Sequence, residues 1–200
     1  MTEGPVLWYL NRSTGVVALV LLTVATVLGV LAVGGRPGGR VPRFVTQAVH
    51  RNLALLGVLF LVVHVIAAVV DEFVEIRWWH ALVPFTSSYQ RVWVGLGAVG
   101  LDLLVLVTVS SLLRTRMHHR GWRALHLTAY LLWAASIAHA VGMGTDLSAG
   151  LWLLTLACGT VVPMAVAWRL TRAAADRLYP QEADPYRTHD AMTMPIRRIP

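Results

Sequence analysis

The sequence predicts an all-α integral membrane protein, a helical bundle with five transmembrane helices, its N-terminus outside and its C-terminus cytoplasmic. Hydrophobic residues make up 56% of the 200 residues and charged residues only 14%, and the mean hydropathy is +0.63. A soluble domain of this length needs more polar surface than that. The protein is therefore expected to be a multi-pass protein of the cell membrane, with the lipid bilayer as its surroundings.

Five apolar segments are long enough to cross a bilayer, whose hydrocarbon core of roughly 30 Å requires about 20 helical residues. They cover residues 6–33, 46–70, 92–113, 122–143 and 147–168. Helix is the expected form because lipid cannot satisfy open backbone hydrogen-bonding groups. Glycine- and arginine-rich stretches separate the segments and predict turns.

The distribution of charge predicts the orientation. The net charge is +7, and all seventeen basic residues are arginine. Arginines gather after the first, third and fifth segments, whereas the loop after the second segment is acidic. Basic loops face the cytoplasm, so these three regions are assigned to the inner side. Charges confined to short loops do not indicate a nucleic-acid partner.

Residues 1–179 are predicted to form the membrane domain, and residues 180–200 a disordered cytoplasmic tail rich in proline and mixed charge. This tail is far too short for a flavin- or nicotinamide-binding domain. Any chemistry must therefore lie within the membrane or come from a partner. The single Cys158 excludes a disulfide framework within the chain.

Four histidines within the predicted spans are the strongest functional signal, because ionisable residues at membrane depth are costly. His50 and His64 lie in the second segment, and His126 and His139 in the fourth. These two segments run in the same direction, and a helical rise of 1.5 Å per residue separates the histidines by roughly 21 Å and 19.5 Å. The sequence therefore pairs His50 with His126 and His64 with His139 at two depths.

Two facing imidazoles at one depth provide both axial ligands that a haem requires, in apolar surroundings that hold the macrocycle. Filled axial positions favour electron transfer over oxygen binding. The spacing of fourteen in the second segment returns to within roughly 40° of one helix face, but the spacing of thirteen in the fourth misses by roughly 140°. A π-bulge, a bend or a different approach of the haem is therefore required there.

The chain resembles the ferric-reductase-like transmembrane domain family, which includes NADPH oxidases, metalloreductases and the haem membrane subunit of the bacterial methionine sulfoxide reductase system. The resemblance covers about residues 8–168. Four stretches carry it: "WYLNRSTGVVALVLLT" at 8–23, "HRNLALLGVLFLVVH" at 50–64, "VPFTSSYQRVWVGLG" at 83–97 and "WRALHLTAYLLWAASIAH" at 122–139.

This resemblance implies two b-type haems, the inner one held by His50 and His126 and the outer one by His64 and His139. The family's fused flavin and nicotinamide domain is absent from this chain, so a quinol or a separate flavoprotein is the expected electron donor. An acceptor protein or a metal is expected at the outer face. Many family members also have a sixth span, which this chain lacks.

Three further charged residues are candidates. The resemblance implies that Arg12 pairs with a haem propionate. The alternative is an arginine that only extends its charged end to the membrane interface, and the sequence is compatible with both. Arg51 follows an inner ligand and either pairs with an inner propionate or serves topology alone. Asp102 lies near the middle of the third segment, where it is protonated and hydrogen-bonded, passes protons or touches a quinone.

The expected function is that of an oxidoreductase component, a di-haem protein that carries electrons across the membrane and works with a separate reductase partner. Two alternatives stay open. A proton or ion transporter would use the intramembrane histidines and Asp102 as a relay. A haem-free subunit would only anchor a redox complex.

Overall fold

The computed structural model describes residues 3–33, 42–71, 75–144 and 148–178, and these residues form helices and connecting turns without a strand. Five of its helical stretches are long and apolar enough to cross a membrane, as predicted. The tail assigned to residues 180–200, the arginines at 36 and 40 and the predicted start of the fifth segment at 147 lie outside the described residues.

Four of the five spans are single helices: α1 (Glu3–Val33), α2 (Arg43–Val70), α4 (Arg91–Leu112) and α7 (Ala149–Leu178). Two short elements lie between them, α3 (Trp78–Leu82) and a 3-10 turn at Arg114–Arg116. The first three long helices begin and end within three residues of the predicted bounds. In contrast, α7 continues past the predicted end at residue 168 as far as Leu178.

The fourth span differs from the single helix expected over residues 122–143. It consists of α5 (His119–Leu127) and α6 (Ala129–Met143), separated at Thr128. The backbone N–H of Thr128 donates to Leu125 O at 3.1 Å, and the Thr128 hydroxyl donates to the same oxygen at 2.7 Å. This tight turn lies between His126 and His139. The directions of their two side chains are therefore no longer fixed by the rotation per residue of one continuous helix.

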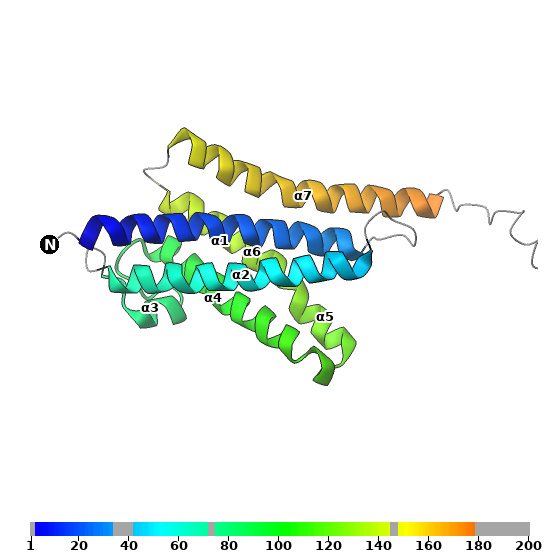
Figure 1. The fold of residues 1–200 in the computed structure, drawn as a ribbon, viewed down its shortest axis with the longest axis horizontal. Coiled ribbons are helices and arrows are strands. Elements are labelled where there is room, and N and C mark those ends of the chain that lie inside the picture. Colours follow the sequence, from blue (N-terminus) through cyan, green and yellow to red (C-terminus); the bar gives the residue numbers. More distant parts are fainter. Residues whose placement is uncertain (1–2, 34–41, 72–74, 145–147, 179–200) are drawn as a thin grey trace, which may run out of the picture.

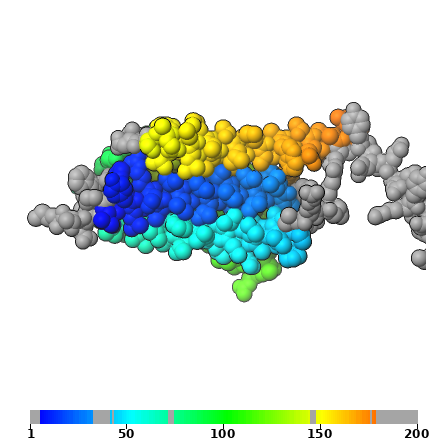
Figure 2. Space-filling view, turned by 45° about the horizontal axis from the view of Figure 1, so that its top comes forward, coloured from blue at the N-terminus to red at the C-terminus, as the bar shows by residue number. Residues whose placement is uncertain are grey.

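Helix α1 lies at the centre of the bundle, with α2 along one side and α7 along the other (Figures 1 and 2). Small and branched residues on α1 are buried in these contacts, among them Ala18, Ala25 and Val30. The hydroxyl of Thr23 is also buried and donates to Leu19 O at 2.8 Å. A polar group inside the bundle is therefore satisfied by its own helix, as lipid surroundings require.

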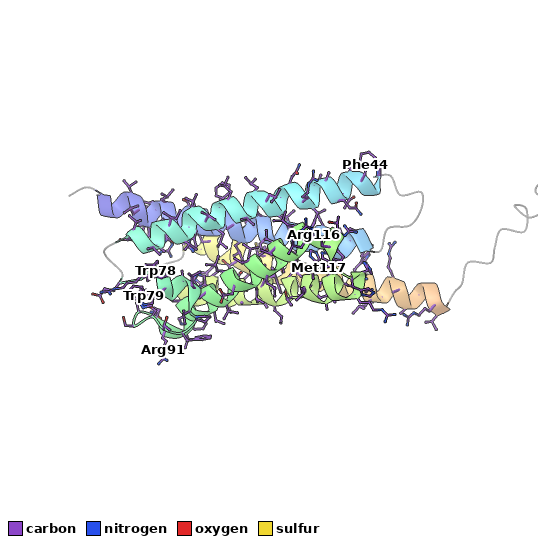
Figure 3. The ribbon with its side chains drawn as sticks, turned by 90° about the horizontal axis from the view of Figure 1, so that it is seen from below. Phe44, Trp78, Trp79, Arg91, Arg116 and Met117 are labelled. Carbon is purple, nitrogen blue, oxygen red and sulfur yellow. The ribbon has the colours of Figure 1, made fainter. Side chains whose placement is uncertain are left out.

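The outward surface between the two ends is apolar. In the most apolar stretch of each span, at most 22% of the residues are buried by the rest of the protein. Trp78, Trp79 and Arg91 lie at one end of the bundle, and Phe44 and Arg116 lie toward the other (Figure 3). Aromatic and basic side chains at both ends of an apolar belt are typical of proteins that span a bilayer.

Candidate functional site

A cavity of 1160 Å³ lies among the helices, lined by α1 and α2 on one side, by α4, α5 and α6 on the other, and in part by α7. Packed helices normally approach to about 8–10 Å, but α2 packs closely along α1 and, among the described helices, makes no comparably extensive contact with α4, α5 or α6. The cavity extends from Asn11 near one end of α1 to Phe44 at the opposite end of the bundle. It is larger than the pocket of a single drug-sized ligand, which holds about 300–1,000 Å³.

All four intramembrane histidines line this cavity, and the structure brings them together in the two pairs that the sequence predicts. The ring centres of His50 and His126 are 6.2 Å apart, with an interplanar angle of 66°. Those of His64 and His139 are 6.3 Å apart, with an angle of 82°. Neither pair is in van der Waals stacking contact, so each leaves a gap between two facing imidazoles.

The width of this gap matches one metal ion bound from both sides. An imidazole nitrogen binds a first-row transition metal at about 2.0 Å and lies about 1.1 Å from its own ring centre, so two opposed ligands have ring centres roughly 6.3 Å apart. Both pairs meet this value without adjustment. Among the described residues, no group of three or more His, Cys, Asp and Glu side chains gathers around a possible metal position.

Hydrogen bonds from Nδ1–H to backbone carbonyl oxygens set the tautomer of three of the four histidines. Nδ1–H of His64 donates to Asn11 O at 2.9 Å, that of His139 to Trp93 O at 2.7 Å, and that of His50 to Ala25 O at 2.8 Å. A carbonyl oxygen only accepts, so Nδ1 must carry the proton and Nε2 must carry the lone pair. Such a bond is the usual means of orienting a metal-binding imidazole.

His126 is held less tightly than the other three histidines. Its Nδ1 lies 3.5 Å from Ser111 Oγ, and the Ser111 hydroxyl donates its own proton to Val107 O at 2.7 Å. The serine oxygen is therefore left as an acceptor for His126 Nδ1–H. The His126 ring also stacks face to face on the Trp122 ring, with ring centres 5.0 Å apart and an interplanar angle of 21°.

The stack on Trp122 continues to a cation, since the guanidinium of Arg114 lies 4.6 Å from the centre of the indole ring. Sequence reasoning did not single out Trp122 and missed this contact. The available signal was the spacing of four residues between Trp122 and His126, which places both side chains on one helix face. The stack on Trp122 restrains the His126 ring, which its long hydrogen bond to Ser111 holds only weakly.

Glycines on the opposing helices make room for the imidazoles. A Cβ atom at Gly15 would lie 2.9 Å from the His64 ring, and one at Gly97 would lie 2.8 Å from the His139 ring. A Cβ atom at Gly29 would lie 3.6 Å from His50, which is an ordinary contact. The His64–His139 pair therefore sits directly against two helix backbones, and the His50–His126 pair sits more loosely.

The two candidate arginines lie at opposite ends of the cavity. Arg12 lies over the Trp8 ring at 4.9 Å, and its Nη2 is buried without a hydrogen-bond partner among the described residues. A buried guanidinium nitrogen of this kind is costly unless an acceptor binds it. Arg51 is exposed and follows His50 on α2. Both positions are suited to an anionic group on a ligand in the cavity.

Asp102 does not belong to this site. Its side chain is exposed and does not line the cavity, whereas the neighbouring Leu101 and Leu104 do. The carboxyl therefore lies on the other side of α4 from the histidines. The described structure does not assemble the relay of histidines and aspartate that a transporter would need.

These features define a helical protein with five helical stretches long and apolar enough to cross a membrane, an internal cavity and two histidine pairs. The chain belongs to the family described as Domain of unknown function (DUF8596), whose model matches residues 6–146. The matched segment contains the first four spans and the four histidines of the two pairs, and α7 lies beyond it. No curated protein and no solved structure matches the chain.

Proposed function

We propose that this protein is a di-haem b electron carrier of the ferric-reductase-like type, which transfers electrons across the membrane. The observation that carries the proposal is the presence of two histidine pairs in one cavity, with ring centres 6.2 Å and 6.3 Å apart. That separation fits one iron between each pair. A bound haem would supply one-electron chemistry through its iron, and two haems at different depths would provide a path across the bilayer.

The protein's own residues bind and orient the two groups in this proposal. Nε2 of His50 and His126 would hold the inner haem, and Nε2 of His64 and His139 the outer one. The carbonyl oxygens that accept from Nδ1 fix three of the ring orientations and strengthen the imidazoles as ligands. The apolar cavity wall excludes water from the macrocycles, which helps to set their potentials.

Arg12 would bind a carboxylate of the outer group, and Arg51 one of the inner group. The buried Nη2 of Arg12 without a partner among the described residues supports the first assignment. A charge-assisted bond to a carboxylate would satisfy that nitrogen and neutralise the acid. For the exposed Arg51, the assignment to the inner group rests on its position beside His50 at the cavity.

The charge distribution supports one orientation of the protein in the membrane. The arginine-rich loops favour an orientation with the His50–His126 pair toward the cytoplasm, the His64–His139 pair toward the outside, the N-terminus outside and the C-terminus inside. Electrons would enter from a separate flavoprotein or a quinol and leave to an acceptor protein or a metal at the outer face. The protein would thus serve as the membrane component of an oxidoreductase.

The experiment that tests the proposal is a reduced-minus-oxidised visible spectrum of the purified protein, with its haem-to-protein ratio. We expect two low-spin b-type haems per chain. His64→Ala and His139→Ala should each remove the outer haem alone, and His50→Ala and His126→Ala the inner one. His80→Ala serves as the control, because His80 lies in α3 outside the cavity and should leave both haems in place.

A folded sample that contains no haem, although it was expressed with ample haem supply, would exclude the electron carrier. The transporter and the haem-free anchor would then be the remaining functions. Full haem content in any of the four single-histidine variants would show that the ligand assignment is wrong.

A further inference from the structure

Asp102 lies near the middle of α4. It lies eleven residues after the first residue of α4 and ten before the last, so a rise of 1.5 Å per residue places it about 15–17 Å from either end. The contacts of α4 with the histidines indicate the same depth for Asp102. Gly97 lies against His139, Ser111 bonds His126, and Asp102 falls between these two levels.

The carboxyl faces outward at this depth. The Asp102 side chain is exposed, and no hydrogen bond or ion pair joins it to another described residue. An ionisable group in the hydrocarbon region almost always faces the bundle interior or a water-filled cavity, and pairs with another polar group. Asp102 meets neither condition among the residues that the structure describes.

The surface around Asp102 is an uncovered apolar helix face. Val105, Leu106 and Val109 are 52%, 38% and 46% exposed, and their spacing from Asp102 places them on the same side of α4. Toward the other end of α4, α3 covers the helix and the Phe85 ring packs on Gly95. The uncovered face therefore begins at Asp102 and follows α4 toward Leu112. We call these residues, Asp102, Val105, Leu106, Val109 and Leu112, the Asp102 face.

We propose that the Asp102 face binds a transmembrane helix of a different subunit, which carries one basic side chain at mid-membrane depth. Charge complementarity supports this occupant, since a cation would neutralise the carboxylate and donate to it where water is excluded. Apolar side chains around the pair would pack on Val105 and Val109.

A second copy of the chain is a poorer fit to this face. Among the described spans, arginines lie toward the ends: Arg12 lies at the level of His64, Arg51 lies at the level of His50, and Arg169 lies in the last third of its helix. No described arginine therefore reaches the depth of Asp102 in a copy with the same orientation. Such a copy would place another carboxyl or an apolar side chain there.

Förster resonance energy transfer in phosphatidylcholine vesicles, which measures helix association, tests the proposal. The full chain, labelled at its C-terminus, is mixed with a synthetic leucine-rich transmembrane helix that has either lysine or leucine at its centre. Interhelical polar contacts in bilayers predict about 5- to 30-fold stronger association of the lysine helix. Asp102→Leu should abolish this preference, Asp102→Asn should reduce it, and Leu59→Ala on the exposed surface of α2 should retain it.

Equal association of the two synthetic helices would overturn the proposal, as would a lysine preference that survives Asp102→Leu. Self-association of the chain that depends on Asp102 would instead assign the face to a second copy. Helix content by circular dichroism verifies that each variant is folded. The assay requires no haem, so its outcome is separate from that of the proposed electron transfer.

Discussion

Replacing Gly97 with alanine should displace His139 and remove the outer haem. The new Cβ atom would lie 2.8 Å from Nδ1 and Cε1 of the His139 ring, whereas carbon atoms in contact prefer about 3.5–4.0 Å. The ring must therefore move by about 0.6 Å or more to reach an ordinary contact. A metal–ligand distance tolerates about 0.2 Å, so this displacement is too large for the iron bond to remain intact.

The His139 ring has little freedom to relax on its other side. Its Nδ1–H is bonded to Trp93 O at 2.7 Å, and the Trp93 indole packs directly on Gly142, where no Cβ atom would fit. Moving the ring thus breaks the hydrogen bond or shifts α4 against α6. We expect a stability loss of about 1–3 kcal/mol, typical of overpacking, together with the loss of the haem.

The assay is the haem-to-protein ratio with a reduced-minus-oxidised spectrum, and the expected result is one haem per chain in place of two. Gly29→Ala is the matched control at the inner pair, because its Cβ atom would lie 3.6 Å from His50 in ordinary contact. Gly121→Ala is the surface control, with no atom within 4 Å. Two haems with unchanged spectrum and midpoint potentials in Gly97→Ala would refute the proposed close fit of His139.

Two further predictions concern the outer arginine and the broken fourth span. Arg12→Gln should lower the midpoint potential of the outer haem, because reduction adds a negative charge that a nearby cation stabilises; a shift on the order of 20–60 mV is expected. A redox titration measures it, and an unchanged outer potential would remove Arg12 from the site. Insertion of one alanine after Thr128 gives the fourth span the same spacing of fourteen as α2, yet it should abolish at least one haem, because it turns His139 by about 100° relative to His126. Retention of both haems would show that the turn at Thr128 does not set the register.

The sequence predicted the spans well because each depends on local composition. A helix that crosses a bilayer needs a minimum number of apolar residues, and α2 and α4 begin and end within three residues of the expected bounds. The two depths of the histidines also followed from the sequence, since rise per residue and alternating direction fix them. The proximity of His64 and His139 then required only that the two helices be neighbours.

The spacing of His126 and His139 allowed a bend between them, but its position at Thr128 was not predictable from the sequence, because neither proline nor glycine marks it. Thr128 ends α5 through two bonds to Leu125 O, and threonine also occurs inside α1, where Thr23 bonds its own helix without a break. The same hydroxyl chemistry therefore accompanies both a continuous and an interrupted helix. Packing of α6 against α4 distinguishes the two cases, and packing is not local information.

The amino-acid sequence by itself determined the number of spans, the depth of each polar residue and the chemistry of the imidazoles, because a bilayer imposes length and polarity on every helix separately. Only the tertiary structure decided how each helix is rotated about its axis. That rotation places Trp122 on His126, directs Asp102 away from the cavity and leaves 6.2 Å and 6.3 Å between the paired rings. It results from contacts among α1, α4 and α6 that lie far apart in the chain.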